Sequence, residues 1–260
     1  MRTICRETFT AAGLLVLLLS MTAYSQAGTP AVSCESLAKL VLPDTTITMT
    51  QPVAAGEFKL PEERRPAPTG GEAAKGRGAA TRLPTGITRP DATDTKSLPA
   101  FCRVAALLKP TSDSTIRIEV WLPLSGWNGK FMGVGGGGFA GNIMYAARFA
   151  GSTGLIDAVR RGYAAASTDS GHDASKPEET GGRFALGHPE KVIDYGYRAV
   201  HLMTVRGKEI TKAFYGALPK HAYFFGASRG GYEAVMDATR YILAHMQPSI
   251  RPAPIRVRLR

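Results

Sequence analysis

A Gly-x-Ser-x-Gly turn between a predicted strand and a predicted helix constrains this chain more than any other feature. The aromatic run at residues 223–225 predicts a buried strand, and residues 232–240 have the apolar spacing of a helix. The turn Gly226-x-Ser228-x-Gly230 matches a nucleophile elbow, in which a tight turn holds a serine hydroxyl exposed. Ser228 is then the candidate nucleophile, and the backbone N–H of Arg229 is a candidate oxyanion donor. The alternative is an ordinary glycine-rich turn without chemistry.

The composition is that of a globular protein. The chain has 260 residues, 44% of them hydrophobic, which allows one large domain or two small ones. Its net charge is +11, but Lys and Arg gather toward the two ends of the chain, and the central motifs are closer to balanced. No basic stripe with interleaved aromatic residues is present, so we expect no nucleic-acid partner.

The first segment has the features of a secretory signal peptide, predicted over residues 1–27. Arg2 and Arg6 give it a basic end, residues 11–19 form an apolar core, and small residues up to Ala27 offer a cleavage site. The apolar core is too short to span a bilayer, although an uncleaved anchor is the alternative. We therefore expect a secreted or periplasmic protein with no membrane contact after cleavage.

Cysteine usage agrees with export. Cleavage would remove Cys5 and leave Cys34 and Cys102. An even pair in an oxidising compartment favours one disulfide over two separate buried thiols.

The rest of the chain divides by composition. Residues 28–55, with a predicted helix at 33–42 and a strand at 45–50, would pack on the core as an N-terminal segment. Residues 56–97 are rich in Pro and Gly without apolar periodicity, which predicts a flexible loop. Residues 98–241 would form the core, an α/β fold.

Strands and helices alternate along this core, which predicts a mostly parallel sheet flanked by helices. Residues 116–122 alternate apolar and polar side chains, as a half-exposed strand does. The other predicted elements are strands at 131–134 and 162–167 and helices at 152–161 and 189–216.

Two loops that follow predicted strands carry candidate site residues. The glycine-rich loop at 135–141 would bring Gly136 and Gly137 to the site as backbone oxyanion donors, with Phe139 beside them as a pocket residue. Phosphate binding is the alternative use, but the loop lacks the Lys-Ser/Thr ending and any dinucleotide fingerprint. Asp169 and His172 follow the strand at 162–167, where ligands bind in open α/β sheets. For His172 the alternative is a hydrogen-bonded turn residue.

Several motifs together resemble the tannase and feruloyl esterase family of secreted α/β-hydrolases over about 98–241. They are Leu98-Pro-Ala-Phe-Cys102-Arg-Val, Ile118-Glu-Val-Trp-Leu-Pro123, Trp127-Asn-Gly-Lys-Phe131, the glycine loop, Thr168-Asp-Ser-Gly-His172, Gly187-His-Pro-Glu-Lys-Val-Ile-Asp194, Tyr197-Arg-Ala-Val-His201 and the Ser228 turn. The resemblance implies hydrolysis of gallate, ferulate or similar aromatic acid esters by a Ser–Asp–His triad beneath an inserted lid. It also implies a disulfide between Cys34 and Cys102.

The chain departs from the family pattern at two places. Ala227 stands where the family usually has a cysteine that bridges to the catalytic histidine region. After Tyr241 there is no Asp or Glu, and the composition shifts to Arg and Pro. We therefore expect a truncated or frameshifted chain, with 242–260 as an aberrant basic tail. The fold would be a partial α/β-hydrolase fold that lacks the later strands and the lid, leaving the elbow strand with an open edge.

This departure removes the expected catalytic partners of Ser228. Glu233 and Asp237 lie on the helix that leaves the turn and are expected to point away from it, and His245 would lie far along the axis. His201 is interpreted as a packed or surface residue. The family's calcium site lies in the lid, so no metal is expected, and no cofactor is implied.

The sequence thus predicts a carboxylic ester hydrolase that takes a small aromatic ester, in a weakly active or inactive chain. Two alternatives stay open. One is a non-catalytic remnant that binds aromatic ligands or a partner. The other is a basic secreted interaction protein that works through its Arg/Pro tail.

Overall fold

The computed structural model describes residues 28–61, 93–147, 153–241 and 255–257. The predicted signal peptide at 1–27, most of the predicted loop at 56–97 and most of the tail at 242–260 lie outside these residues. The predictions for those segments therefore stay predictions.

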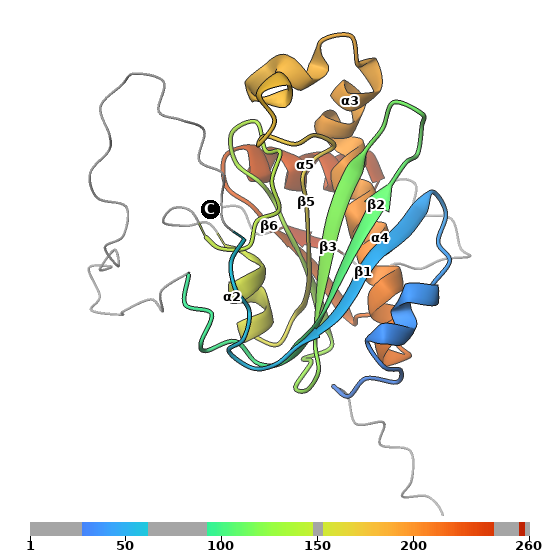
Figure 1. The fold of residues 1–260 in the computed structure, drawn as a ribbon, viewed down its shortest axis with the longest axis vertical. Helices are drawn as coiled ribbons and strands as arrows, with labels where there is room; N and C mark the ends of the chain where they lie inside the picture. Colours follow the sequence, from blue (N-terminus) through green and yellow to red (C-terminus); the bar gives the residue numbers. More distant parts are fainter. Residues whose placement is uncertain (1–27, 62–92, 148–152, 242–254, 258–260) are drawn as a thin grey trace, which may run out of the picture.

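One sheet of seven strands organises the described chain (Figure 1). Its order is β1-β2-β3-β5-β4-β6-β7. The pairs from β1 to β5 are antiparallel, and those that join β5, β4, β6 and β7 are parallel. The strands are β1 (Thr45–Val53), β2 (Phe101–Leu108), β3 (Ile116–Pro123), β4 (Lys130–Val134), β5 (Ala164–Thr168), β6 (His221–Phe225) and β7 (Ile255–Val257).

Helices cover both faces of this sheet. α2 (Leu155–Arg160) lies on one face, and α4 (Ala199–Tyr215) and α5 (Arg229–Tyr241) lie on the other. On β3, Ile118 and Val120 belong to the core under α4, whereas Trp121 belongs to the core under α2. This alternation follows from the period of two along a strand. The predicted α/β fold is confirmed, in a sheet that is half antiparallel.

Strand β3 is more buried than its sequence suggested. The prediction of a half-exposed strand is wrong, because every residue of β3 except Arg117 is buried. The strand lies inside the sheet and both of its faces are covered. The polar residue that misled the pattern is Glu119, whose carboxylate accepts hydrogen bonds from Arg103 Nε, Trp121 Nε1 and the Tyr145 hydroxyl, at 2.8, 2.9 and 2.6 Å. Strand β2, which supplies Arg103, was not predicted.

The predicted helix at 189–216 is found as three consecutive helical segments. α3 (Pro189–Ile193) leads into a π-helical turn, η4 (Asp194–Arg198), and then into α4. Gly216 ends the run in a left-handed conformation with φ of 72°. Within α4, a Cβ on Gly207 would lie 2.7 Å from the Phe131 ring, so the glycine lets the helix approach the sheet closely.

The open edge expected at the elbow strand is not observed. Residues 255–257 form β7, which pairs in parallel with β6 at Ala222, Tyr223 and Phe224. The expectation failed because it treated the whole tail as separate from the fold. In the part of the chain that the structure describes, β7 is the edge strand on this side.

The N-terminal segment is joined to the sheet covalently. Cys34 precedes the short helix η1 (Glu35–Lys39), found within the helix predicted at 33–42, and bonds to Cys102 on β2. Their Cα atoms are 5.5 Å apart, and both side chains are buried. The predicted disulfide is confirmed.

This disulfide is expected to contribute strongly to stability because the two cysteines are 68 residues apart in sequence. Loop-closure entropy for such a separation is worth about 4 kcal/mol. The double substitution Cys34→Ala/Cys102→Ala should lower the free energy of unfolding by about that amount, measured by urea denaturation. Reducing the wild-type chain should produce the same loss, and the reductant should leave the double variant unchanged. Equal stability of the oxidised and reduced wild-type chains would contradict the prediction.

Candidate active site

The turn that carries Ser228 has the geometry of a nucleophile elbow. Strand β6 ends at Phe225 and helix α5 begins at Arg229, so the predicted order of strand, turn and helix is confirmed. Ser228 lies between them with φ of 56°, and it is exposed. A residue other than glycine seldom adopts this conformation, and such strain is concentrated at functional sites. The strained backbone holds the serine out of the turn, as the elbow requires.

Two glycines make this turn possible. A Cβ on Gly226 would lie 2.4 Å from the carbonyl oxygen of Gly230, and a Cβ on Gly230 would lie 2.8 Å from the carbonyl oxygen of Gly136. Backbone fills the space on both sides, so neither position accepts a side chain without movement. The glycines at these two positions of the motif are therefore needed for packing.

The glycine-rich loop after β4 packs directly against this turn. The N–H of Gly135 donates to the carbonyl of Phe225 at 2.9 Å, which continues the pairing of β4 with β6. A Cβ on Gly135 would lie 2.7 Å from the Cα of Gly230. The loop and the elbow lie far apart in sequence, at Gly135 and Gly226, and they meet here backbone to backbone.

The carboxylate of Glu233 links the glycine loop to the elbow helix. Glu233 is 1% exposed; one of its oxygens accepts the N–H of Gly136 at 3.1 Å, and the other accepts the Ser170 hydroxyl at 3.0 Å. The expectation that Glu233 points away from the turn is therefore wrong. The prediction of Gly136 as an oxyanion donor is corrected by the same bond, because its N–H is already engaged. Burial raises the pKa of Glu233 to about 7, against the lowering effects of Arg229 and these two donors.

Two predicted oxyanion donors keep suitable positions. The N–H of Arg229 lies in the first turn of α5, where a helix supplies no acceptor. Gly137 is half-buried in the glycine loop, and its carbonyl accepts the N–H of Ala140 at 2.9 Å. The assignment of both groups to an oxyanion hole stays a prediction.

The side chain of Arg229 is held between two tyrosines that sequence reasoning missed. Its guanidinium carbon lies 3.8 Å from the ring centroid of Tyr195 on η4 and 4.5 Å from that of Tyr232 on α5. It also donates to the carbonyl of Tyr195. Tyr195 lies within the helix predicted at 189–216, and nothing local in the sequence indicated its contact with Arg229.

His172 is a buried residue stacked on an aromatic ring. It is 2% exposed, and its ring centroid lies 3.9 Å from that of Phe184. The interpretation as a pocket residue and the alternative of a hydrogen-bonded turn residue both stay predictions. Burial lowers the pKa of His172 to about 4, so the imidazole is neutral near pH 7.

A cavity of about 160 Å³ brings together two of the three predicted pocket residues. Asp169 and His172 line it, whereas Phe139 and Ser228 do not. Phe139 is 55% exposed on the glycine loop, with its ring centroid 6.4 Å from that of Tyr195. The prediction of Phe139 as a residue of the substrate pocket stays a prediction.

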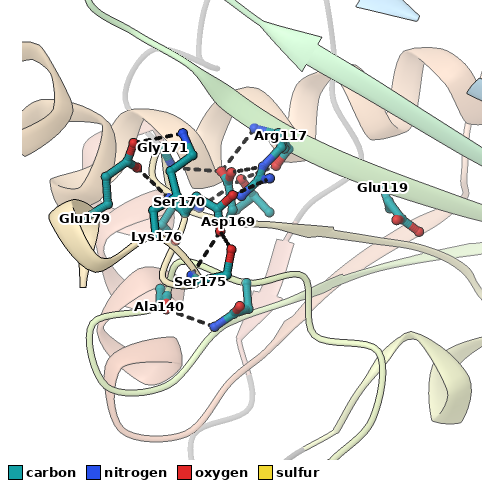
Figure 2. A network of polar contacts seen from close by, with 12 residues as sticks. Arg117, Glu119, Ala140, Asp169, Ser170, Gly171, Ser175, Lys176 and Glu179 are labelled. Carbon is teal, nitrogen blue, oxygen red and sulfur yellow. Dashed lines mark hydrogen bonds and ion pairs between the residues drawn. The ribbon is translucent and has the colours of Figure 1, made fainter. Parts of the chain in front are cut away.

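Asp169 is committed to an ion pair in this cavity. Its carboxylate accepts the backbone N–H of Arg117 at 3.0 Å and the Arg117 Nε at 2.7 Å (Figure 2). Burial raises the pKa of Asp169 to about 6, against the lowering by Arg117. This arrangement fixes the loop that follows β5.

No histidine is hydrogen-bonded to Ser228 among the residues that the structure describes. His201 Nδ1 lies 3.0 Å from the Asp237 carboxylate, and its ring stacks on Tyr241 with centroids 3.4 Å apart. This pairing agrees with the interpretation of His201 as a packed residue. His245 lies outside the described residues, so its exclusion as a base stays a prediction.

The described ranges contain no group of three or more His, Cys, Asp or Glu side chains arranged to hold a metal ion. Within the same ranges, no helix has the length and apolarity required to cross a bilayer.

Comparison with known proteins identifies relatives of this chain. The family model described as tannase and feruloyl esterase matches residues 102–245, more than half of the chain. The chain belongs to the tannase and feruloyl esterase family. An uncharacterized esterase of Xanthomonas campestris is 39% identical over 232 residues, which is 88% of this chain and 34% of that protein. A probable feruloyl esterase B-2 of Aspergillus flavus is 34% identical over 141 residues, covering 54% of this chain and 25% of that protein.

Solved structures agree with the family assignment. The crystal structure of feruloyl esterase B from Aspergillus oryzae superposes with a TM-score of 0.57 at 28% identity, covering 80% of this chain and 34% of that one. A second esterase structure from the same organism gives a TM-score of 0.56 at 26% identity, with the same coverage. This chain therefore spans about a third of the length of these family members.

The buried carboxylate of Glu233 is expected to make stability depend on pH. Because burial raises its pKa to about 7 from an ordinary 4.5, the folded chain binds more protons than the unfolded chain between these values. The free energy of unfolding should thus fall as pH rises from about 4.5 to 7, by on the order of 2–3 kcal/mol for this group. Glu233→Gln keeps an acceptor for Gly136 but does not titrate, and it should flatten this slope in urea denaturation at a series of pH values.

A matched control is Glu178→Gln, which changes an exposed carboxylate and should keep the wild-type slope. Parallel pH profiles for the wild type and Glu233→Gln would show that Glu233 does not carry the effect.

Proposed function

We propose that this chain carries the nucleophile elbow of a serine carboxylic ester hydrolase, with Ser228 as the nucleophile. The observation that supports this most directly is the exposed Ser228, at φ of 56° between β6 and α5. An ordinary turn has no need for a strained serine between two tightly packed glycines. The esterase names of the relatives point to the same reaction class.

The reaction that this geometry supports is acyl transfer. The Ser228 hydroxyl attacks the ester carbonyl, and its proton passes to a base while the carbonyl oxygen becomes an oxyanion. The backbone N–H groups of Arg229 and Gly137 are the donors that we assign to that oxyanion. Ser228 lies beside the first turn of α5, whose positive dipole end favours the developing negative charge. We assign the base and its orienting acid to no described residue.

We further propose aromatic acid esters, such as ferulates or gallates, as substrates. Two relatives carry the name feruloyl esterase B. In this chain, Phe139 is 55% exposed and Tyr232 is 46% exposed, and both lie beside the Tyr195–Arg229 contact next to the elbow. Exposed aromatic rings and a guanidinium plane offer stacking surfaces to an aromatic acid.

A second candidate function is binding of aromatic ligands without turnover. It is favoured by the absence of a histidine hydrogen-bonded to Ser228 in the described part of the chain, because an unactivated serine is a weak nucleophile. The same aromatic surface would then bind the acid or its ester.

Export of the chain is a further proposal, supported by the Cys34–Cys102 disulfide.

Hydrolysis of methyl ferulate and methyl gallate by the full chain tests the main proposal. Ser228→Ala should lower kcat/KM by at least about 10³-fold if Ser228 is the nucleophile. A fluorophosphonate probe should label the wild type and fail to label this variant. Ser112→Ala changes another exposed serine, outside the elbow, and should behave as the wild type.

The outcomes separate the two candidates. Hydrolysis that persists in Ser228→Ala would exclude this serine as nucleophile. Saturable ferulate binding to both chains, without hydrolysis by either, would support the binding function instead.

A further inference from the structure

The end of the sheet opposite to Ser228 gathers basic and aromatic side chains. Strands β4, β5 and β6 run parallel, so their amino ends meet at one end of the sheet, and their carboxyl ends lead toward the glycine loop and the elbow (Figure 1). Lys130 begins β4 beside His221, which begins β6, and the N–H of Lys220 donates to the carbonyl of Gly129 at 2.8 Å. The five residues of β6 separate this end from Ser228 by roughly 15 Å. We call these side chains the basic face, which consists of Lys130, Arg161, Tyr163, Lys220, His221 and Tyr223.

The cations of the basic face have no acidic partners. Lys130, Arg161 and Lys220 make no ion pair with any residue that the structure describes. The acidic residue nearest to Arg161 along the chain, Asp157, pairs with Arg160 at 3.3 Å instead. No Asp or Glu occurs in the segments that form the face, residues 126–130, 160–164 and 216–223. The face therefore carries positive charge that the described chain does not compensate.

Two tyrosine rings lie among these cations. Lys130 Nζ and the guanidinium carbon of Arg161 are 5.9 and 5.3 Å from the ring centroid of Tyr163. The ring of Tyr223 meets that of Tyr163 edge to face, with centroids 6.1 Å apart, and both side chains are half-buried. Tyrosine combines an apolar ring with a polar hydroxyl and is enriched where an apolar phase meets water.

The loop before β6 adds an exposed apolar side chain to this end. Leu218 lies two residues before Lys220 and is 47% exposed. A single exposed leucine is ordinary on a protein surface. The combination of Lys or Arg with aromatic and leucine side chains is, however, typical of surfaces that lie on a membrane.

The N-terminal segment joins the fold at the same end. A Cβ on Gly28 would lie 3.0 Å from the carbonyl oxygen of Trp127, in the turn before Lys130. The N–H of Ala31 donates to the carbonyl of Phe214, near the end of α4, at 2.7 Å. Residues 1–27, whose apolar run at 11–19 predicts entry into a membrane during export, are therefore attached beside the basic face.

We propose that the basic face binds the surface of a membrane that contains anionic phospholipids. The three cations attract the headgroups, and the tyrosines and Leu218 lie at the boundary with the acyl chains. A nucleic acid or an acidic polysaccharide offers negative charge but no apolar layer for Leu218, so a lipid surface fits the face better. The contact is peripheral and leaves Ser228 directed away from the membrane.

This proposal departs from the sequence-based expectation of no membrane contact after cleavage. The three cations come from segments far apart in sequence, so no basic stripe with interleaved aromatic residues was visible before the sheet brought them together. The proposal does not depend on ester hydrolysis.

Sedimentation of the full chain with lipid vesicles tests this inference. We expect binding to vesicles of equal parts phosphatidylcholine and phosphatidylglycerol, little binding to phosphatidylcholine alone, and release as the salt concentration rises. Absence of binding to the anionic vesicles would overturn the proposal. Polygalacturonate and single-stranded DNA, offered without vesicles, should bind more weakly. Tighter binding of either would assign the face to another polyanion and overturn the lipid proposal.

Substitutions locate the contact. Lys220→Glu and Arg161→Glu should each lower the partition coefficient at least about fivefold, because a basic residue near an anionic surface contributes a free energy of about that size. Leu218→Ser should lower it severalfold without changing the charge. Lys109→Glu makes the same charge change at an exposed lysine after β2, at the opposite end of the sheet, and should bind nearly as the wild type does.

The variants also separate this proposal from the esterase proposal. Ser228→Ala should bind vesicles like the wild type, whether or not the chain hydrolyses esters. Equal partitioning of the wild type, Lys220→Glu and Arg161→Glu would place the lipid contact elsewhere, residues 1–27 included, and overturn the proposal. A loss in Lys109→Glu as large as that in Lys220→Glu would show an effect of net charge alone, with the same consequence.

Discussion

The candidate site depends on one buried carboxylate. Glu233 joins the helix after the elbow, the glycine loop through Gly136 and the loop after β5 through Ser170. These segments are distant in sequence, and the sheet brings only their strands together. An unpaired carboxylate at this depth would be costly, so each of its hydrogen bonds has to form when the chain folds. The hydrogen bonds of Glu233 therefore add to the backbone contact between Gly135 and Phe225 in fixing the glycine loop relative to Ser228.

The same network stabilises backbone that would otherwise relax. Ser170 and Ser228 both have positive φ, at 59° and 56°, although neither is glycine. Ser170 is fixed by its hydroxyl bond to Glu233, and Ser228 by the packing of Gly226 and Gly230 on either side. Strain of about 1–3 kcal/mol at each position persists only where the surroundings determine the conformation. Both strained residues lie on loops that follow strands of the parallel half of the sheet.

Sequence patterns predicted correctly those elements whose structure is determined by residues close together in the chain. The strand, turn and helix around Ser228 and the disulfide at Cys34 were predicted because their signals are contained in short stretches or in residue counts. The direction of the Glu233 side chain was not predicted correctly. Helical spacing tells on which side of a helix a residue lies, but not which loop packs against that side. Glu119 on β3 was misread for a related reason: its partners come from β2 and from Tyr145, which no alternation pattern on β3 can reveal.

Tyr195 connects the elbow to the cavity beside Asp169. Its ring lies under the Arg229 guanidinium on one side, and its centroid is 6.0 Å from that of His172. The π-helical turn η4 sets this position, because the extra residue of such a turn shifts the side chains that precede α4 relative to its regular spacing. A change at Tyr195 would therefore act on the elbow and on the wall residue His172, whereas a change at Ser228 would act on the elbow alone. Comparing Tyr195 with Ser228 separates an effect transmitted through the ring contacts of Tyr195 from an effect on the nucleophile itself.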